Sequence, residues 1–189
     1  MPYYDGFDPN YETKFCQFEA EALSDESTVI TGYASIFGQK DNGGDSVQKG
    51  AFDASLKRLV ACGGKVKMLW QHDPTRPIGV WDSVVEDGHG LKVSGRILPD
   101  VQAGREALAL LKAGAVDGLS IGYRTIRSEK AAKGGRLLHE IELWEVSLVT
   151  FPMLAQARVR TTDNSGADDD AALAQTLADT FRSARDMLA

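Results

Sequence analysis

The sequence of 189 residues contains little cysteine and no long apolar runs. Its two cysteines, Cys16 and Cys62, stand in no paired motif, so we expect reduced, buried thiols rather than a disulfide or a metal-ligand pair. No apolar stretch approaches the length of a membrane-spanning helix. Residues 1–10 lack the basic and apolar regions of a secretory signal. We therefore expect no membrane partner and a cytosolic setting.

Positive charge is also scarce, because the chain has 21 Lys and Arg residues but 27 Asp and Glu residues, which gives a formal net charge of −6. The Lys and Arg residues are scattered along the chain, whereas a nucleic-acid surface needs them clustered against phosphates. We therefore expect no nucleic-acid partner. The hydrophobic share of 43% and the length suit one well-buried core.

Short segments rich in β-branched and aromatic residues dominate the chain and are separated by turn-forming residues. Apolar residues at helical spacing predict two helices, over 51–61 and over 100–113, the second with Asp100 as its N-cap. Short strands with two intervening helices predict a compact, mostly antiparallel β-barrel with helices on its outside. The expected strands cover 28–37, 66–70, 78–85, 91–98, 119–126 and 137–151.

The composition changes near residue 161, where a polar, acidic stretch is typical of a flexible linker. Leu173, Leu177 and Phe181 then follow at helical spacing. We expect one folded domain over 1–160, followed by an acidic linker and a helical tail over 161–189. The tail either docks on a partner or packs on the same domain, and the sequence favours neither.

Two residues stand in settings that suit acid–base and nucleophilic chemistry. His72 ends the apolar run Met68-Leu-Trp-Gln-His72, where one side of the imidazole is open for a general base. Ser120 lies between two glycines in Gly118-Leu-Ser-Ile-Gly122, which leaves room for a substrate carbonyl. This pentapeptide also matches the nucleophile elbow, but that motif requires a helix after the serine. A β-rich segment follows here, so an α/β-hydrolase is only an alternative.

A third candidate is Glu145, a carboxylate inside an apolar strand pattern. Alternation with period two puts it on the face of Ile141, Leu143 and Val149, where a charge needs a partner such as an imidazolium. Glu142 is the alternative if the strand bulges. The three histidines lie far apart in the sequence and neither cysteine is in a ligand pair, so we expect no metal and no other cofactor.

Several segments in order resemble the HK97-type caudovirus prohead protease family, which is related to the herpesvirus assemblin proteases. The resemblance spans roughly residues 30–155. The matching segments are Gly32-Tyr-Ala-Ser-Ile-Phe-Gly38, Gly50-Ala-Phe52, Leu69-Trp-Gln-His-Asp73, Pro77-Ile-Gly79, Gly118-Leu-Ser-Ile-Gly-Tyr123 and Leu143-Trp-Glu-Val-Ser-Leu-Val-Thr-Phe-Pro152.

The resemblance implies an assemblin-like barrel of about seven strands and a serine endopeptidase. It carries over His72 as general base, Ser120 as nucleophile and Glu145 as the acid. The implied substrate is the scaffolding segment of a capsid-protein precursor, together with the chain itself, inside the assembling procapsid in the cytoplasm of a bacterial host. Self-association is also implied as an option.

One departure from the family is the pair Met153-Leu154 after Pro152, where members commonly carry Ala-Asn. Assemblins bind the oxyanion through a downstream loop that contains arginine, and Arg158 and Arg160 are candidates for that role here. The competing hypothesis is a catalytically inactive assembly factor that binds the capsid protein without cutting it.

Overall fold

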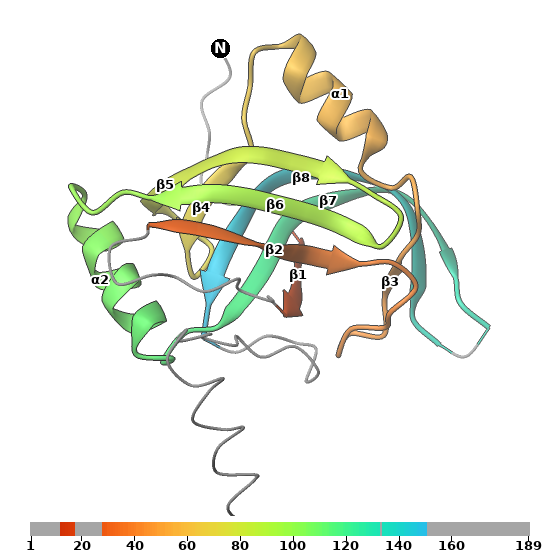
Figure 1. Cartoon of the computed structure of the whole chain (residues 1–189). Coiled ribbons are helices and arrows are strands. Elements are labelled where there is room, and N and C mark those ends of the chain that lie inside the picture. The colour runs from red at the N-terminus through yellow and green to blue at the C-terminus, as the bar shows by residue number, and fades with distance from the viewer. Residues whose placement is uncertain (1–11, 18–27, 133, 151–189) are drawn as a thin grey trace, which may run out of the picture.

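A computed structural model of the chain describes residues 12–17, 28–132 and 134–150, and a strongly curled β-sheet dominates it (Figure 1). Two helices accompany the sheet in this part of the chain, α1 (Asp53–Ala61) and α2 (Gln102–Lys112). The strands are β1 (Glu12–Gln17), β2 (Val29–Ile36), β3 (Ser46–Val47), β4 (Lys67–Trp70), β5 (Asp73–Glu86), β6 (Gly90–Ile97), β7 (Gly118–Lys130) and β8 (Arg136–Val149).

The strands follow the order β1-β7-β8-β4-β5-β6-β2, and β3 pairs with β8 outside this path. Neighbouring strands are antiparallel except that β4 and β3 run parallel to β8. The sheet curls until its edge strands β1 and β2 approach each other (Figure 1). The prediction of a mostly antiparallel, barrel-like fold of about seven strands is thus confirmed, with the parallel β4–β8 pair as the exception.

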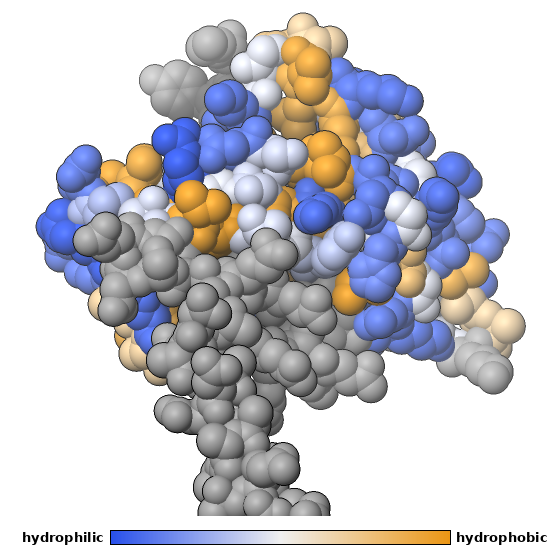
Figure 2. Space-filling view, viewed as in Figure 1, coloured by the Kyte–Doolittle hydropathy of each residue, from blue (hydrophilic) through white to orange (hydrophobic). Residues whose placement is uncertain are grey.

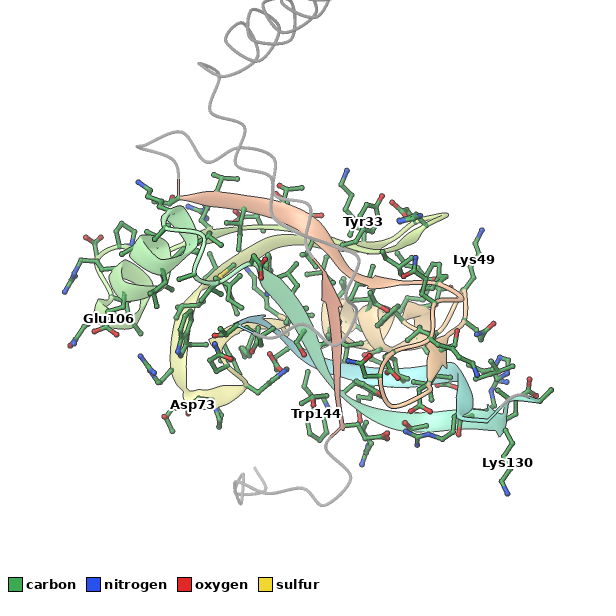
Figure 3. The ribbon with its side chains drawn as sticks, turned by 90° about the horizontal axis from the view of Figure 1, so that it is seen from below. Tyr33, Lys49, Asp73, Glu106, Lys130 and Trp144 are labelled. Atoms are coloured by element: carbon green, nitrogen blue, oxygen red, sulfur yellow. The ribbon has the colours of Figure 1, made fainter. Side chains whose placement is uncertain are left out.

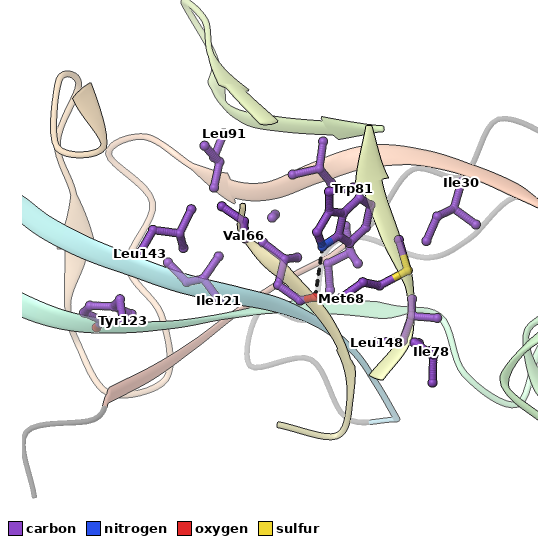
Figure 4. Packing of buried hydrophobic residues seen from close by; sticks show 14 of the residues in the cluster. Ile30, Val66, Met68, Ile78, Trp81, Leu91, Ile121, Tyr123, Leu143 and Leu148 are labelled. Atoms are coloured by element: carbon purple, nitrogen blue, oxygen red, sulfur yellow. Dashed lines mark hydrogen bonds between the residues drawn. The ribbon is translucent and has the colours of Figure 1, made fainter. Parts of the chain in front are cut away.

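The interior of the curl is filled by side chains that alternate along the strands (Figure 4). Trp81 is the largest of them to carry a polar atom that must be satisfied, and its Nε1–H donates to the carbonyl oxygen of Val146 at 3.2 Å. Each fully buried apolar side chain of this core contributes about 1.5–3 kcal/mol to the stability of the fold. Fully buried members of this core include Ile30, Met68, Ile78, Leu91, Ile97, Leu119 and Ile121.

β1 was not predicted from the sequence, and it pairs with β7 from Glu12 opposite Tyr123 to Gln17 opposite Gly118. The Glu12 carboxylate accepts hydrogen bonds from the side chains of Thr125 and Arg136. Hydrogen bonds to Asp45, and after them the bond to Glu12, raise the pKa of the Arg136 guanidinium above its usual value. Because β1 pairs with β7, β7 has a paired neighbour on each side, β8 on one and β1 on the other.

α1 packs against β8 and β5, and its N-terminal end is fixed by a residue outside the helix. Phe52 at the N-cap offers no capping side chain, and Glu86 of β5 accepts the N–H groups of Gly50 and Phe52 instead. Figure 2 shows apolar surface over this helix, and Val60 is 80% exposed. Cys62 at the C-cap is also exposed, so the prediction of a buried thiol is wrong there.

α2 lies against β5 and β6, and Gly104 lets it approach the end of β6 closely. A Cβ atom at Gly104 would lie 2.1 Å from the carbonyl oxygen of Leu98. In an exposed helix, replacing glycine by alanine stabilises by about 1 kcal/mol, but here the backbones would have to separate. We expect Gly104→Ala to lower the free energy of unfolding by about 1–3 kcal/mol in urea denaturation.

Gly88→Ala is the matched control for this prediction, because a Cβ there would meet no atom within 4 Å. It should stay within about 0.5 kcal/mol of the wild type. If Gly104→Ala proved as stable as Gly88→Ala, the close approach of α2 to β6 would be contradicted.

Among the described residues, no helix is long and apolar enough to cross a bilayer.

Candidate functional site

Ser120 lies within β7 on the outer face of the sheet. Its neighbours Leu119 and Ile121 point into the core, so the serine side chain faces the opposite side. The strand continues unbroken to Lys130 and pairs antiparallel with β8. A nucleophile elbow needs a helix directly after the serine, so the α/β-hydrolase alternative is contradicted.

A bulge in β8 determines which side chains accompany Ser120. Gly122 of β7 pairs with Glu145, whereas the next residue, Tyr123, pairs with Leu143. Trp144 is therefore the extra residue on β8, and such an insertion reverses the faces of the strand beyond it. Figure 3 labels Trp144 at this point of β8.

The strict alternation predicted for this strand is therefore wrong across the bulge. Ile141 and Leu143 lie in the core, and so does Val146 on the other side of the bulge. Glu145 consequently faces away from Ile141 and Leu143. It shares the outer face with Ser147, which pairs directly with Ser120 of β7.

His72 belongs to a tight turn rather than to the strand end that the sequence predicted. β4 ends at Trp70, which pairs with Asp73, and the two residues between them have φ values of 52° for Gln71 and 62° for His72. Two positive φ angles are typical of the hairpin turn whose twist matches that of its strands. A left-handed backbone costs about 1–2 kcal/mol per residue outside glycine, so the turn must be held by its surroundings.

The end of β8 and the residue that follows it supply that hold. The backbone N–H of Gln71 donates to the carbonyl of Leu148 at 3.0 Å, and its side-chain amide donates to Thr150 Oγ1 at 2.6 Å. The backbone N–H of His72 donates to Ser147 Oγ at 3.1 Å. The segment that carries Glu145 thus also fixes the turn that carries the imidazole.

The three residues singled out in the sequence meet at this place. His72 Nε2 lies 2.6 Å from Ser120 Oγ, and His72 Nδ1 lies 2.5 Å from Glu145 Oε1. With the ring proton on Nδ1, the imidazole donates to the carboxylate and accepts from the serine hydroxyl. Such a continuous chain from hydroxyl to imidazole to carboxylate can activate an oxygen nucleophile.

The site is largely closed to solvent. Ser120 is 0% exposed, and the side chains of Glu145 and His72 are 4% and 14% exposed. The imidazole is therefore the most accessible of the three side chains. Burial also strengthens the hydrogen bonds of the chain, because water does not compete for them.

Two other carboxylates near the site have different partners. Asp73, next to His72 in sequence, accepts the N–H and O–H groups of Thr75 at 2.8 and 2.6 Å. The Thr75 hydroxyl is the main reason that the pKa of Asp73 lies below its usual value. Glu142, the alternative acid, accepts a hydrogen bond from Arg124 at 2.6 Å.

The remaining histidines lie apart from this site. His139 Nε2 lies 3.1 Å from Glu129 Oε1. His89 lies in an exposed turn, and its ring packs edge-on against the ring of Tyr33. No group of three or more His, Cys, Asp or Glu side chains in the described ranges could hold a metal ion. Arg158, Arg160, the pair Met153-Leu154 and the linker and tail over 161–189 lie outside those ranges.

Sequence reasoning missed Ser147, which contacts two of the three residues. Its hydroxyl accepts from the N–H of His72 and donates to Glu145 Oε2 at 2.5 Å. The available signal was its spacing, because a small polar residue two positions after Glu145 in a strand shares the face of that carboxylate.

Comparisons with known proteins agree in pointing to one family. Residues 16–170 match the model of the family described as caudovirus prohead serine protease. The chain is 34% identical over 134 residues to the prohead protease of Enterobacteria phage HK97, covering 69% of this chain and 58% of that protein. It is 30% identical over 167 residues to the capsid polyprotein of Pseudomonas phage PAJU2, covering 84% and 24%. The chain thus spans less than two thirds of the length of either relative.

Among solved structures, the fold is similar to that of the capsid assembly protease gp21 of bacteriophage T4. The TM-score is 0.64, and the match covers 76% of this chain and 98% of that chain. The sequence identity is 14%, so this likeness concerns the fold alone.

Proposed function

The chain belongs to the caudovirus prohead serine protease family, and on this premise we propose that it is a serine endopeptidase that cuts a capsid-protein precursor during procapsid maturation. The observation that carries the proposal is the hydrogen-bonded chain from Ser120 through His72 to Glu145. No cofactor takes part in the proposed reaction.

In the proposed mechanism, His72 Nε2 takes the proton of Ser120 Oγ as this oxygen attacks the carbonyl carbon of the scissile peptide. The imidazolium then gives that proton to the leaving amine, and an ester links Ser120 to the acyl fragment. Water, deprotonated by the same imidazole, hydrolyses the ester and restores the serine. Glu145 keeps the ring proton on Nδ1 and stabilises the positive charge that the ring acquires.

The proposed substrate and setting rest on the relatives. A prohead protease and a capsid polyprotein both resemble this chain in sequence, which supports a scaffolding segment of the capsid precursor as substrate. They also support action inside the procapsid within the bacterial host. Cleavage of the chain itself and self-association belong to the same proposal. A catalytically inactive assembly factor is the outcome that the next experiment must separate from it.

Co-expression of the full chain with its capsid-protein precursor tests the proposal by intact mass and by N-terminal mapping of the products. We expect the wild type to yield trimmed precursor and Ser120→Ala to leave it at full length. Ser35→Ala is the matched control, because this buried hydroxyl on β2 makes no hydrogen bond within the described part of the chain. It should trim like the wild type.

Two results would contradict the proposal in different ways. Identical trimming by Ser120→Ala would show that another group is the nucleophile. Unchanged precursor mass with every variant, the wild type included, would favour an assembly factor that binds without cutting.

A further inference from the structure

Ser147 occupies the centre of the site without being one of the three residues in the proposed proton path. It is 0% exposed and lies on β8, between β7 and β4. Its direct partner on β7 is Ser120, and its direct partner on β4 is Leu69. A polar side chain at so enclosed a position must have its hydrogen bonds satisfied by protein.

The two hydrogen bonds of the Ser147 hydroxyl connect the residues on both sides of the imidazole. Its oxygen accepts the backbone N–H of His72 at 3.1 Å, and its proton is donated to Glu145 Oε2 at 2.5 Å. The other carboxylate oxygen, Oε1, faces His72 Nδ1. With a different donor on each oxygen, the carboxylate of Glu145 is held against rotation.

The same hydroxyl also acts on the backbone of the turn. His72 has a left-handed φ of 62°, which is costly for any residue with a Cβ atom. Such a conformation persists only where neighbouring groups enforce it. The bond from the His72 N–H to Ser147 is one of these constraints, so one hydroxyl restrains the imidazole through its backbone and the carboxylate through its oxygen.

We propose that Ser147 is a positioning residue that aligns the imidazole of His72 with the carboxylate of Glu145. This inference rests on the proposed function and deepens it. Ser147 acts through these two residues and not on the reacting atoms. Its loss therefore slows the chemical step rather than weakening substrate binding, because displacement of a reacting group by about 1 Å costs on the order of 100-fold in rate.

The test compares Ser147→Ala with Ser55→Ala in the full chain, using the capsid-protein precursor as substrate. Ser55 is the matched control, since it is another buried serine whose oxygen accepts a backbone N–H of β8, that of Leu143 at 2.9 Å. We expect Ser147→Ala to lower kcat by about 10- to 100-fold while KM stays within about threefold. Ser55→Ala should keep both constants near the wild-type values.

A second readout needs no substrate, namely the proton NMR resonance of the His72 Nδ1–H. We expect this downfield signal to be broadened or lost in Ser147→Ala and kept in Ser55→Ala. If Ser147→Ala does not fold, Ser147→Cys replaces it, because a thiol is only slightly larger than the hydroxyl and is a weaker donor and acceptor. The same expectations apply to that variant.

The role of Ser147 is overturned if its variant keeps kcat within threefold of Ser55→Ala, or if the Nδ1–H resonance is unchanged. Failure of the proposed function looks different, because the wild type itself would then show no cleavage that depends on Ser120. In that case the resonance alone decides, and its loss in Ser147→Ala but not in Ser55→Ala still supports the positioning role.

Discussion

Replacing His72 by asparagine is expected to slow cleavage by about five to six orders of magnitude, as is replacing Ser120 by alanine. The two residues act as one unit, since the hydroxyl becomes a nucleophile only when the imidazole 2.6 Å away takes its proton. The double variant should therefore be no slower than either single variant. Asparagine is chosen at position 72 because it tolerates a positive φ, so the turn can keep its backbone shape.

His89→Asn is the control for this series, since His89 lies in an exposed turn away from Ser120. It should retain the full rate. Rates are measured on the purified chain with the capsid precursor, and a thermal unfolding curve is recorded for each variant. If the two single losses multiplied in the double variant, His72 and Ser120 would act independently, and a shared proton transfer would be ruled out.

Glu145→Gln is expected to lower kcat by about four orders of magnitude while the fold is retained. The carboxylate has a donor at each oxygen, Ser147 at Oε2 and His72 Nδ1 at Oε1. An amide offers only one oxygen, so one of these donors meets an NH2 group. If the amide oxygen keeps its bond to Ser147, the NH2 group faces His72 Nδ1 and the ring proton must move to Nε2. Nε2 can then no longer accept the proton of Ser120.

The matched control is Glu142→Gln, three residues earlier in the same strand. Glu142 forms a half-buried ion pair with Arg124 and does not contact His72, so its loss should change kcat by less than about threefold. Equal losses for Glu142→Gln and Glu145→Gln would contradict the assignment of the acid. Full activity of Glu145→Gln would contradict it as well.

Much of the sheet could be predicted from local sequence, because its strands are runs of β-branched and aromatic residues bounded by turn formers. The strand expected over 28–37 is observed as Val29–Ile36, and that over 91–98 as Gly90–Ile97. The helix expected over 100–113 is Gln102–Lys112. Its N-cap is Val101 rather than Asp100, and it carries no side-chain cap.

The missed features depend on contacts between distant segments. β1 has no β-branched run and is fixed by pairing with β7, more than 100 positions later. The extra residue Trp144 appears only when the register of β7 against β8 is known. Ser120, Glu145 and His72 could be named from motifs and family resemblance. The turn that carries His72 could not be predicted. Hairpin turns with two positive φ angles usually contain Asn, Asp or Gly, whereas Gln71 and His72 occupy these positions here.

The pairing of β1 with β7 restricts how a polypeptide could approach the serine. Many proteins bind an extended peptide by adding it as a further strand to an open sheet edge. At Ser120 both edges of β7 are already taken, by Ser147 of β8 on one side and Phe15 of β1 on the other. While β1 stays in place, an incoming chain cannot pair with β7 at Ser120, so it has to cross over the strands to reach the hydroxyl instead of lengthening the sheet there.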